Sequence, residues 1–399
     1  MSAGNGALKK RSIQIVGGLV TLALIAALAA FMFVPPLFDS FTNKVERDAP
    51  FTPSAEAKTL HERLFVADLH SDSLLWNRDL LVENARGHVD LPRLVKGNVA
   101  LQAFTVVTKT PKNMNFQSNS GDTDNITTLA IMQRWPRRTY SSLLERALYQ
   151  AEKLHNMADR SNGALTLVTS GRDLDAFLNK RNEDRKAVAA ILGIEGMHCA
   201  ESKLENVDKL YNAGFRMMGI THFFDNELGG SAHGVSKGGL TPFGRDCVKR
   251  MEELHVLVDV AHSSPAVIDD VLAMATRPVV LSHGGVTGTC DNVRNIGDEH
   301  VKGIAETGGV IGIAYFDSAV CGNDVKSIVA AIRYVAELAG FDHVGLGSDF
   351  DGVVTTPFDT AGLAEITEEL QKQGVPETDI AKVMGGNTLR LMRESLPES

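Results

Sequence analysis

Eight short apolar runs alternate along this chain with amphipathic segments, and the alternation restricts the fold more than any other feature of the sequence. The apolar runs lie at residues 64–69, 99–107, 187–194, 215–220, 256–260, 279–281, 310–314 and 344–346. The amphipathic segments lie at residues 141–158, 204–212, 243–254, 266–275, 298–307, 324–339 and 361–373. Strands that alternate with helices predict βα units and a parallel sheet.

Eight strands in a chain of 399 residues predict an α/β fold of the (β/α)8 TIM-barrel type. The spacing leaves one long insertion, residues 108–186, between the second and third strands; it is polar at its start and helical later. A doubly wound parallel sheet is the alternative. No G-x-G-x-x-G motif follows an early strand, so nothing supports the dinucleotide-binding form of that fold.

The composition is that of a globular protein, with 44% hydrophobic and 22% charged residues, and it excludes a disordered or multi-span membrane chain. The net charge is −9 and no basic block is present, so nucleic acid is not expected as a partner. The four cysteines, Cys199, Cys247, Cys290 and Cys321, form no C-x-x-C pair. We expect buried or idle thiols, with one disulfide as the alternative if the domain lies outside the cytosol.

An uncharged apolar segment, residues 15–34, is long enough to cross a membrane, because twenty helical residues span about 30 Å. Lys9, Lys10 and Arg11 precede it, and the positive-inside rule keeps them in the cytoplasm. A cleaved signal peptide, with Ala27 and Ala29 at its cleavage site, is the alternative.

The interpretation as an anchor predicts four parts of the chain. They are a cytoplasmic N-terminus at 1–11, one transmembrane helix at 12–34, a linker at 35–58 and a folded domain at 59–399. The folded domain then lies outside the cytoplasm, in the periplasm if the source is bacterial, and the chain is a single-pass protein of the cell membrane.

Six of the predicted strands end in His, Asp or Glu. These side chains are His70, Asp72, Glu195, His222, His262, His283 and Asp349. The carboxyl ends of the strands of a parallel barrel meet at one rim, where the active sites of such barrels lie. We therefore expect these side chains to lie close together.

Imidazole and carboxylate ligands together suit zinc or a similar divalent ion. Two ions about 3.5–4 Å apart can share a bridging carboxylate and a bridging hydroxide. Glu195 is the expected bridge, because it is the only acid at the end of the third strand. The alternative, ion pairs without a metal, would bury several charges at a high cost. We expect the other histidines to be structural; they are His61, His88, His155, His198, His233, His255, His300 and His343.

The sequence resembles the membrane (renal) dipeptidase family of the amidohydrolase superfamily, as a bacterial-type member with an N-terminal membrane anchor. The resemblance extends from about residue 65 to residue 393. It is carried, in order, by DLHSD at 68–72, GIEGMH at 193–198, THFFDN at 221–226, GLTPFG at 239–244, DVAHSS at 259–264, SHGG at 282–285, DNVRNI at 291–296, GSDFDG at 347–352 and GGNTLR at 385–390.

The resemblance implies two zinc ions per chain. It assigns His70 and Asp72 to one ion and His262 and His283 to the other, with Glu195 between them.

The resemblance also implies three roles toward the substrate. His222 contacts the substrate and steadies the tetrahedral intermediate, Arg294 binds the substrate carboxylate, and Asp349 is the acid–base group that also contacts the substrate. Asp351 is expected to have a local structural role, and Asp68 to support the ligands from behind.

The function implied is a zinc-dependent dipeptidase that hydrolyses the peptide bond of dipeptides by a metal-bridging hydroxide. Two alternatives stay open. One is another binuclear amidohydrolase, acting on a lactam or an N-acyl amino acid, and the other is a catalytically dead, membrane-tethered binding protein. The expected partners are a dipeptide and, through the N-terminal helix, the membrane; a homodimer is left open.

Overall fold

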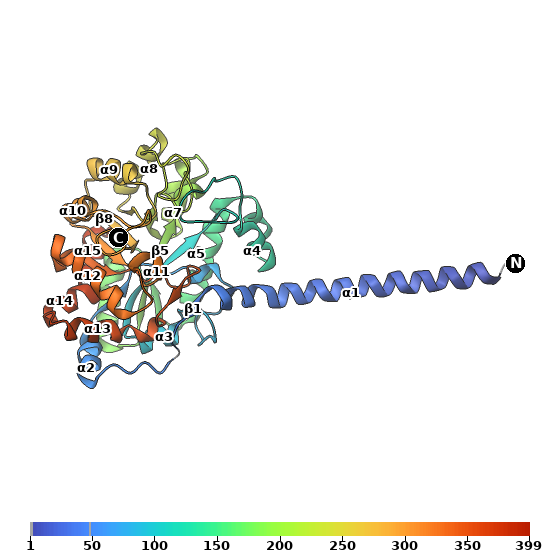
Figure 1. Ribbon diagram of the computed structural model, residues 1–399, viewed down its shortest axis with the longest axis horizontal. Coiled ribbons are helices and arrows are strands. Elements are labelled where there is room, and N and C mark those ends of the chain that lie inside the picture. The colour runs from blue at the N-terminus through green and yellow to red at the C-terminus, as the bar shows by residue number, and fades with distance from the viewer. Residues whose placement is uncertain (1–2, 48) are drawn as a thin grey trace.

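The eight predicted strands form eight parallel strands that close into a barrel (Figure 1). The computed structural model describes residues 3–47 and 49–399. The barrel strands are β2 (Val66–Asp68), β3 (Val99–Val107), β5 (Val188–Glu195), β6 (Phe215–Gly219), β7 (Leu257–Asp259), β8 (Val279–Gly284), β9 (Val310–Ile313) and β10 (Val344–Leu346). Their order is β3-β2-β10-β9-β8-β7-β6-β5, and the pairing of β3 with β5 closes the ring. The predicted TIM-type barrel is confirmed.

Every residue of these eight strands is buried, which is why the strands read as continuous apolar runs. Successive residues still point to opposite faces of the sheet. In β5, Ala189 and Ile191 belong to one apolar cluster, whereas Val188, Ala190 and Leu192 belong to another. The barrel is therefore filled on its inside and covered by helices on its outside, and the strand ends are left for polar side chains.

Helices surround the barrel where the amphipathic segments predict them (Figure 1). They are α7 (Glu205–Asn212), α8 (Pro242–Glu253), α9 (Pro265–Met274), α10 (Asp298–Glu306), α12 (Val325–Ala339) and α13 (Ala364–Lys372). Four further helices were not predicted; they are α15 (Asn387–Ser395) and the shorter α3 (Leu91–Lys96), α11 (Asp317–Val320) and α14 (Glu377–Ala381). The side chains of Thr241 and Ser264 accept hydrogen bonds from the first turns of α8 and α9, and each of these helices begins with proline. Both features favour a helix start at that point.

The predicted insertion, residues 108–186, lies between β3 and β5. It contains α4 (Ile126–Met132), α5 (Leu143–Arg160), β4 (Leu165–Leu167) and α6 (Gly171–Glu183). The sequence did not predict β4, because three residues give too little alternation to detect. This strand pairs with the start of β5.

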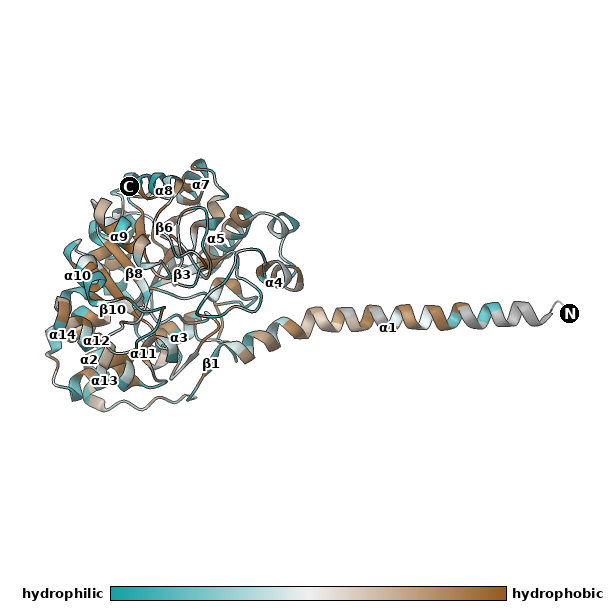
Figure 2. Ribbon diagram, turned by 45° about the horizontal axis from the view of Figure 1, so that its top comes forward, coloured by the Kyte–Doolittle hydropathy of each residue, from teal (hydrophilic) through white to brown (hydrophobic). Residues whose placement is uncertain are grey.

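The N-terminal helix, α1 (Ala3–Thr42), projects away from the barrel (Figure 1). Its stretch Ile13–Thr42 is long and apolar enough to cross a membrane, and the most apolar window of that stretch is not buried by the protein. Figure 2 shows the hydrophobic colouring of α1 along most of its length, with hydrophilic residues near its N-terminal end. The predicted anchor, residues 12–34, lies within this helix. Of the predicted cytoplasmic segment, residues 1 and 2 lie outside the described residues, as do the side chains of residues 3–8 and of Arg11. The side chain of Ala27, at the alternative cleavage site, also lies outside them.

The predicted linker, residues 35–58, differs from the structure over its first part. The helix continues through Pro35 and Pro36 to Thr42. A proline inside a helix costs about 3 kcal/mol, and the next turn of this helix forms ion pairs with the barrel domain. There the buried carboxylate of Asp39 lies 3.2 Å from Arg78 Nε and 2.8 Å from Arg86 Nε.

Two further elements lie within the predicted linker. Strand β1 (Lys44–Val45) pairs in parallel with β11 (Thr355–Thr356), and α2 (Ala55–Arg63) begins before residue 59. The chain between the apolar helix and the barrel is therefore largely attached to the barrel, and its longest stretch without a helix or a strand lies between β1 and α2.

Candidate metal centre and active site

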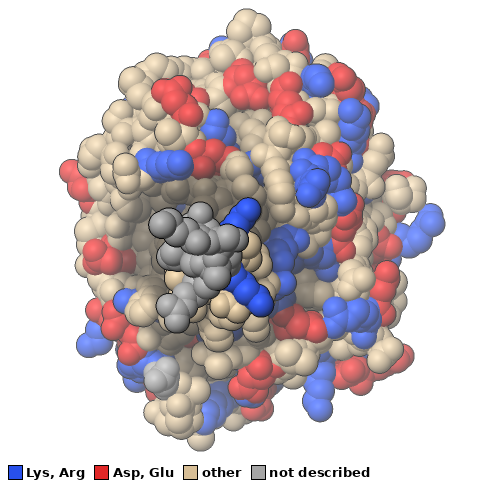
Figure 3. Space-filling view, turned by 90° about the vertical axis from the view of Figure 1, so that its right-hand side faces the viewer, with Lys and Arg blue, Asp and Glu red and all other residues tan. Residues whose placement is uncertain are grey.

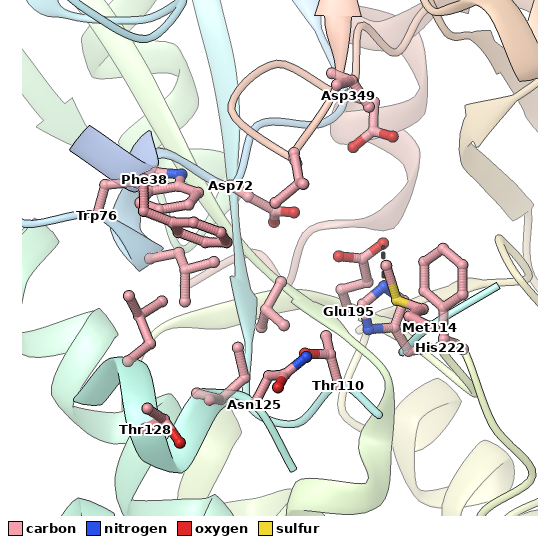
Figure 4. Close-up of a pocket in the computed structure, with 18 of the residues that line it drawn as sticks. Phe38, Asp72, Trp76, Thr110, Met114, Asn125, Thr128, Glu195, His222 and Asp349 are labelled. Carbon is pink, nitrogen blue, oxygen red and sulfur yellow. Dashed lines mark ion pairs between the residues drawn. The ribbon is translucent and has the colours of Figure 1, made fainter. Parts of the chain in front are cut away.

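The structure brings the seven predicted rim side chains together at the carboxyl ends of the barrel strands. His70 and Asp72 follow β2, Glu195 ends β5, His222 follows β6, His262 follows β7, His283 lies in β8 and Asp349 follows β10. All seven are buried. Figure 4 shows Asp72, Glu195, His222 and Asp349 facing one cavity. The prediction that these side chains would lie close together agrees with this arrangement.

Glu195 is at the centre of the cluster. Its Oε1 atom lies 2.8 Å from Nε2 of His262, 3.3 Å from Nε2 of His283 and 3.4 Å from Nε2 of His222. Its Oε2 atom lies 3.8 Å from Nε2 of His70. The two oxygens of one carboxylate thus face four imidazole nitrogens. The four histidines come from four different strands.

His70 links this group to the remaining acids. Its Nε2 atom lies 3.6 Å from Oδ1 of Asp72 and 3.9 Å from Oδ1 of Asp349. The side chains form three overlapping groups whose ligand atoms lie within 4.8 Å of one another. The groups are His70 with Glu195 and His283, Glu195 with His222 and His262, and His70 with Asp72 and Asp349.

These groups divide the histidines differently from the family resemblance, which pairs His262 with His283. The two Nε2 atoms of that pair are 3.0 Å apart, so the pairing is compatible with the geometry as well. The Nε2 atom of His222 lies 3.4 Å from Glu195, almost the same distance as that of His283, at 3.3 Å, which the resemblance names as a ligand. Its assignment to the substrate therefore rests on the resemblance.

The electrostatics of the cluster favour a bound cation. Burial and the neighbouring charge of Asp72 raise the pKa of Glu195 to about 8, and burial raises the pKa of Asp349 to about 7. Burial lowers the pKa of His222, His262 and His283, which leaves their imidazoles neutral, as metal binding requires.

At His70 burial lowers the pKa, but the charges of Glu195 and Asp72 outweigh this effect and raise it well above its ordinary value. The carboxylates thus favour positive charge at the Nε2 atom, which is fully buried and has no hydrogen-bond partner. A divalent cation would supply the positive charge and give this Nε2 atom a partner. Neutral imidazoles with carboxylates are the donors that zinc and similar ions prefer.

Two buried aspartates hold the backbone of the rim. Asp68 accepts hydrogen bonds from the backbone N–H groups of His70 at 3.1 Å and Ser348 at 3.0 Å. Asp259 accepts hydrogen bonds from the N–H groups of Ala261 at 3.0 Å and Ser282 at 2.9 Å. Asp68 thus supports the site through the backbone and not through an imidazole ring. Asp259 was not singled out from the sequence, although its place shortly before a histidine repeats that of Asp68.

Arg294 is 3% exposed and lies beside the cluster. Its Nη2 atom donates a hydrogen bond to the carbonyl of His283 at 2.9 Å. It lines the same cavity as Glu195 and Asp349, and the charges of these two acids partly offset the effect of burial, which lowers the pKa of Arg294. Arg294 is therefore not a solvated surface arginine, which is the ordinary state of this residue type.

A disulfide joins Cys290 to Cys321, with Cα atoms 5.3 Å apart. The expectation of free thiols is therefore wrong for these two cysteines, whereas Cys199 and Cys247 are free and buried. The spacing could not reveal the pair, because the two loops that carry it meet only when β8 and β9 lie side by side. The bridge attaches the loop that carries Arg294 to the end of α11.

Loss of this disulfide is expected to lower the free energy of unfolding by roughly 3–4 kcal/mol, because the bridge closes a loop of 31 residues. The measurement is urea denaturation of the double variant Cys290→Ala, Cys321→Ala. The parent protein treated with dithiothreitol serves as the control and should lose the same amount. Equal stability of oxidised parent, reduced parent and double variant would contradict a structural role.

Two side chains that the sequence placed outside the site lie close to it. The ring of His233 stacks on Phe223, 4.6 Å between centroids, and lies 5.3 Å from the ring of His262. The Nδ1 atom of His233 is hydrogen-bonded to the carbonyl of Phe116 at 2.8 Å. Asp351 is ion-paired with Arg78 at 2.7 Å and lies outside the three ligand groups, in agreement with the local structural role expected for it.

The comparison with known protein families decides the family to which the chain belongs. The sequence model of the membrane dipeptidase family (peptidase family M19) matches residues 54–397. The chain belongs to the membrane dipeptidase family. This membrane dipeptidase is 27% identical over 394 residues to dipeptidase aclJ of Aspergillus oryzae. The alignment covers 94% of this chain and 87% of the relative. It is 25% identical over 362 residues to the uncharacterized dipeptidase C3A11.10c of Schizosaccharomyces pombe, covering 86% and 84%.

Solved structures share its barrel. The probable dipeptidase PvdM from Pseudomonas aeruginosa has a TM-score of 0.72 at 21% identity, over 86% of this chain and 98% of that one. A metallopeptidase from Rhodobacter sphaeroides, liganded with a phosphinate mimic of the dipeptide L-Ala-D-Ala, has a TM-score of 0.67 at 21% identity, over 83% and 99%. Family and relatives identify the chain as a metal-dependent dipeptidase, a hydrolase that acts on peptide bonds.

Proposed function

We propose that this membrane dipeptidase hydrolyses free dipeptides at a centre of two zinc ions that share Glu195. The observation that carries the proposal is the position of Glu195, whose two oxygens face the Nε2 atoms of four histidines at 2.8–3.8 Å. His70 and Asp72 would hold one ion, and His262 and His283 the other. When bound, two such ions supply a hydroxide near neutral pH and polarise the scissile carbonyl.

The side chains around this centre have separate tasks. The carboxyl group of Asp349, within 3.9 Å of His70, accepts the proton of the attacking water and returns it to the leaving amine. His222 donates a hydrogen bond to the oxygen on which negative charge develops, which stabilises the transition state. Arg294 binds the free carboxylate of the substrate with its guanidinium fork.

This arrangement selects dipeptides by length. The carboxylate site at Arg294 and the metal-binding side chains line one cavity, so the distance between them is fixed. A longer peptide held by its carboxylate would present a different bond to the centre. The dipeptide mimic bound to the metallopeptidase from Rhodobacter sphaeroides supports a substrate of this size.

One experiment tests this function against its alternatives. The full-length protein in nanodiscs is assayed with free dipeptides, N-acyl amino acids and lactams, and the metal content of the same sample is measured. We expect about two zinc ions per chain and hydrolysis of dipeptides above the other two classes. Preferred hydrolysis of an N-acyl amino acid or a lactam would favour another binuclear amidohydrolase. Absence of hydrolysis from protein with its full metal content would favour a binding protein.

We also propose that α1 anchors the chain in the cell membrane, with the barrel outside the cytoplasm. The exposed Lys9 and Lys10 before the apolar stretch support this orientation, and the disulfide Cys290–Cys321 supports an oxidising compartment. A homodimer was left open from the sequence. Sedimentation of the protein in detergent would measure whether one forms.

Protease added to intact cells or spheroplasts is expected to release a fragment of nearly the size of the barrel domain, because the barrel faces the protease. Permeabilised cells provide the control, and N-terminal sequencing of the untreated protein distinguishes an anchor from a cleaved signal. A barrel protected until the membrane is broken would show the opposite orientation. A mature protein that begins near residue 30 would show cleavage.

A further inference from the structure

The end of α1 and the residues that join it to β1, here called the neck (residues 39–45), are packed against the barrel domain. Asp39 and Asn43 are only 2% and 4% exposed, whereas Ser40 and Phe41 between them are exposed. Figure 3, viewed from the side from which α1 projects, shows the surface hollowed beside the helix. One side of the neck therefore faces the protein, and the other faces solvent.

The neck is joined by a buried arginine to the loop that carries Asp349. This loop, residues 347–354, follows β10 and is here called the acid loop. Arg78 lies between two buried acids, with its Nε atom 3.2 Å from Asp39 of α1 and its Nη2 atom 2.7 Å from Asp351 of the acid loop. Because a buried charge is costly without its partner, this arginine holds the neck and the acid loop together.

Hydrogen bonds also connect the neck to the acid loop directly. The Oδ1 atom of Asn43 accepts a hydrogen bond from the backbone N–H of Val353 at 2.9 Å. The Nδ2 atom of Asn43 donates to Asp39 at 2.8 Å, so the two buried side chains of the neck support each other. The N–H of Lys44 donates to the carbonyl of Val354 at 3.1 Å, and β1 then pairs with β11.

A buried histidine adds a further connection. The Nδ1 atom of His88 accepts a hydrogen bond from the N–H of Asp351 at 2.9 Å, so the ring hydrogen on Nε2 is donated to the carbonyl of Lys44 at 2.9 Å. The same ring stacks on Phe350, with 5.2 Å between the centroids. The neck and the acid loop are thus bonded to the two nitrogens of one imidazole.

The backbone of the acid loop needs such support. Asp349, Asp351 and Val353 have positive φ angles of 61°, 65° and 64°. The left-handed conformation is sterically unfavourable for residues other than glycine, and it is exceptional for a β-branched residue such as valine. Strained backbone of this kind persists only where the surrounding contacts determine it. At two of the three positions, Asp351 and Val353, those contacts include the neck.

The strained loop carries the proposed acid–base group. The carboxyl group of Asp349 lies 3.9 Å from Nε2 of His70, and Asp349 is two residues from Asp351. Relaxation of the loop at Asp351 or Val353 would therefore move this carboxyl group relative to the metal-binding side chains. A displacement of about 1 Å in a catalytic group can lower the rate by about 100-fold.

We propose that Asp39 and Asn43 are positioning residues of the active site, which hold the acid loop in the conformation that places Asp349 beside the metal-binding cluster. The inference rests on the proposed role of Asp349 in dipeptide hydrolysis. It holds whether residues 12–34 remain as an anchor or are removed, because the neck follows them and stays with the barrel. The helix that contains the apolar span thus also supports the catalytic site.

The test measures kcat and KM separately for a free dipeptide, with the full-length protein in nanodiscs. Asn43→Ala is expected to lower kcat by roughly 10- to 100-fold, because the N–H of Val353 loses its acceptor and the acid loop relaxes. KM should change little, because Arg294 is untouched, and the metal content should stay that of the parent. Asp39→Asn, which removes the charge and keeps the shape of the side chain, should act in the same direction.

A glycine in the acid loop provides a rescue. Glycine adopts a positive φ without steric cost, so a loop with Val353→Gly needs the contact to Asn43 less. The double variant Asn43→Ala, Val353→Gly is therefore expected to recover most of the kcat that Asn43→Ala loses. Such recovery assigns the effect of the neck to the conformation of the acid loop.

Asn98→Ala is the matched control for a general loss of stability. Asn98 also has a positive φ, 52°, and its side chain donates hydrogen bonds to the carbonyls of His61 at 2.7 Å and Leu64 at 3.1 Å. It precedes β3 and so lies at the end of the barrel opposite to the active site. Its replacement should lower the free energy of unfolding and leave kcat unchanged.

The outcomes separate this proposal from the proposed function. A parent-like kcat in both Asn43→Ala and Asp39→Asn overturns the positioning role while the dipeptidase function stands. The positioning role is also overturned if Val353→Gly restores nothing, if Asn98→Ala loses as much kcat, or if Asn43→Ala loses its metal. Failure of the parent to hydrolyse any free dipeptide overturns both proposals.

Discussion

Replacement of Glu195 by alanine is expected to lower kcat/KM for a dipeptide by roughly 1,000-fold or more and to reduce the bound metal below two ions per chain. The side chain faces Nε2 of His262 at 2.8 Å and Nε2 of His70 at 3.8 Å, so its loss removes the group shared by both halves of the cluster. Metal analysis and steady-state kinetics on the same preparation measure the effect.

The barrel itself should remain folded in this variant. Glu195 is a buried acid whose pKa burial raises to about 8, so its removal relieves a desolvation cost as well as removing a ligand. Far-UV circular dichroism checks the fold. Glu205→Ala, an exposed acid in the first turn of the helix after the same strand, is the matched control and should retain metal and activity. A metal-free Glu195→Ala protein with full activity would contradict the mechanism.

The barrel could be predicted because its strands are buried on both faces. Runs such as 99–107 and 187–194 are apolar at most positions, with Gln102 and Thr105 as buried polar exceptions, and they stop where the backbone reaches the rim. The polar residues that follow, among them His70 and Glu195, are therefore visible in the sequence as interruptions of apolar runs. Parallel strands bring such interruptions to one end, which is why the cluster could be expected before its geometry was known.

Other features depend on contacts between distant parts of the chain. The composition of residues 35–42 is that of a linker. The ion pairs of Asp39 with Arg78 and Arg86, which fix this segment to the barrel domain, form only in the folded protein. The Cys290–Cys321 pair and the support of the rim by Asp259 likewise need the strand order. Periodicity and composition describe local structure, and they do not report which distant surface a segment will contact.

Replacement of Arg294 by alanine is expected to lower kcat/KM for a free dipeptide by roughly 30-fold to several thousand-fold. A charge-assisted contact to a desolvated partner is worth roughly 2–5 kcal/mol, at about 1.4 kcal/mol per ten-fold change. The guanidinium is buried and its Nη2 atom is already oriented by the carbonyl of His283, so little ordering is lost when substrate binds. Lysine should restore only part of the activity, because it offers a point charge without the fork.

The substrate provides the decisive control for Arg294. Amidation of the C-terminus should strongly impair hydrolysis by the parent and should affect Arg294→Ala little, because the contact is already absent. Metal content should be unchanged, which separates loss of the carboxylate site from disturbance of His283. Arg245→Ala, which removes a half-exposed arginine paired with Asp270 at 2.8 Å on the surface, should behave as the parent does. Near-equal kcat/KM for the parent and Arg294→Ala on a free dipeptide would remove the carboxylate site from Arg294.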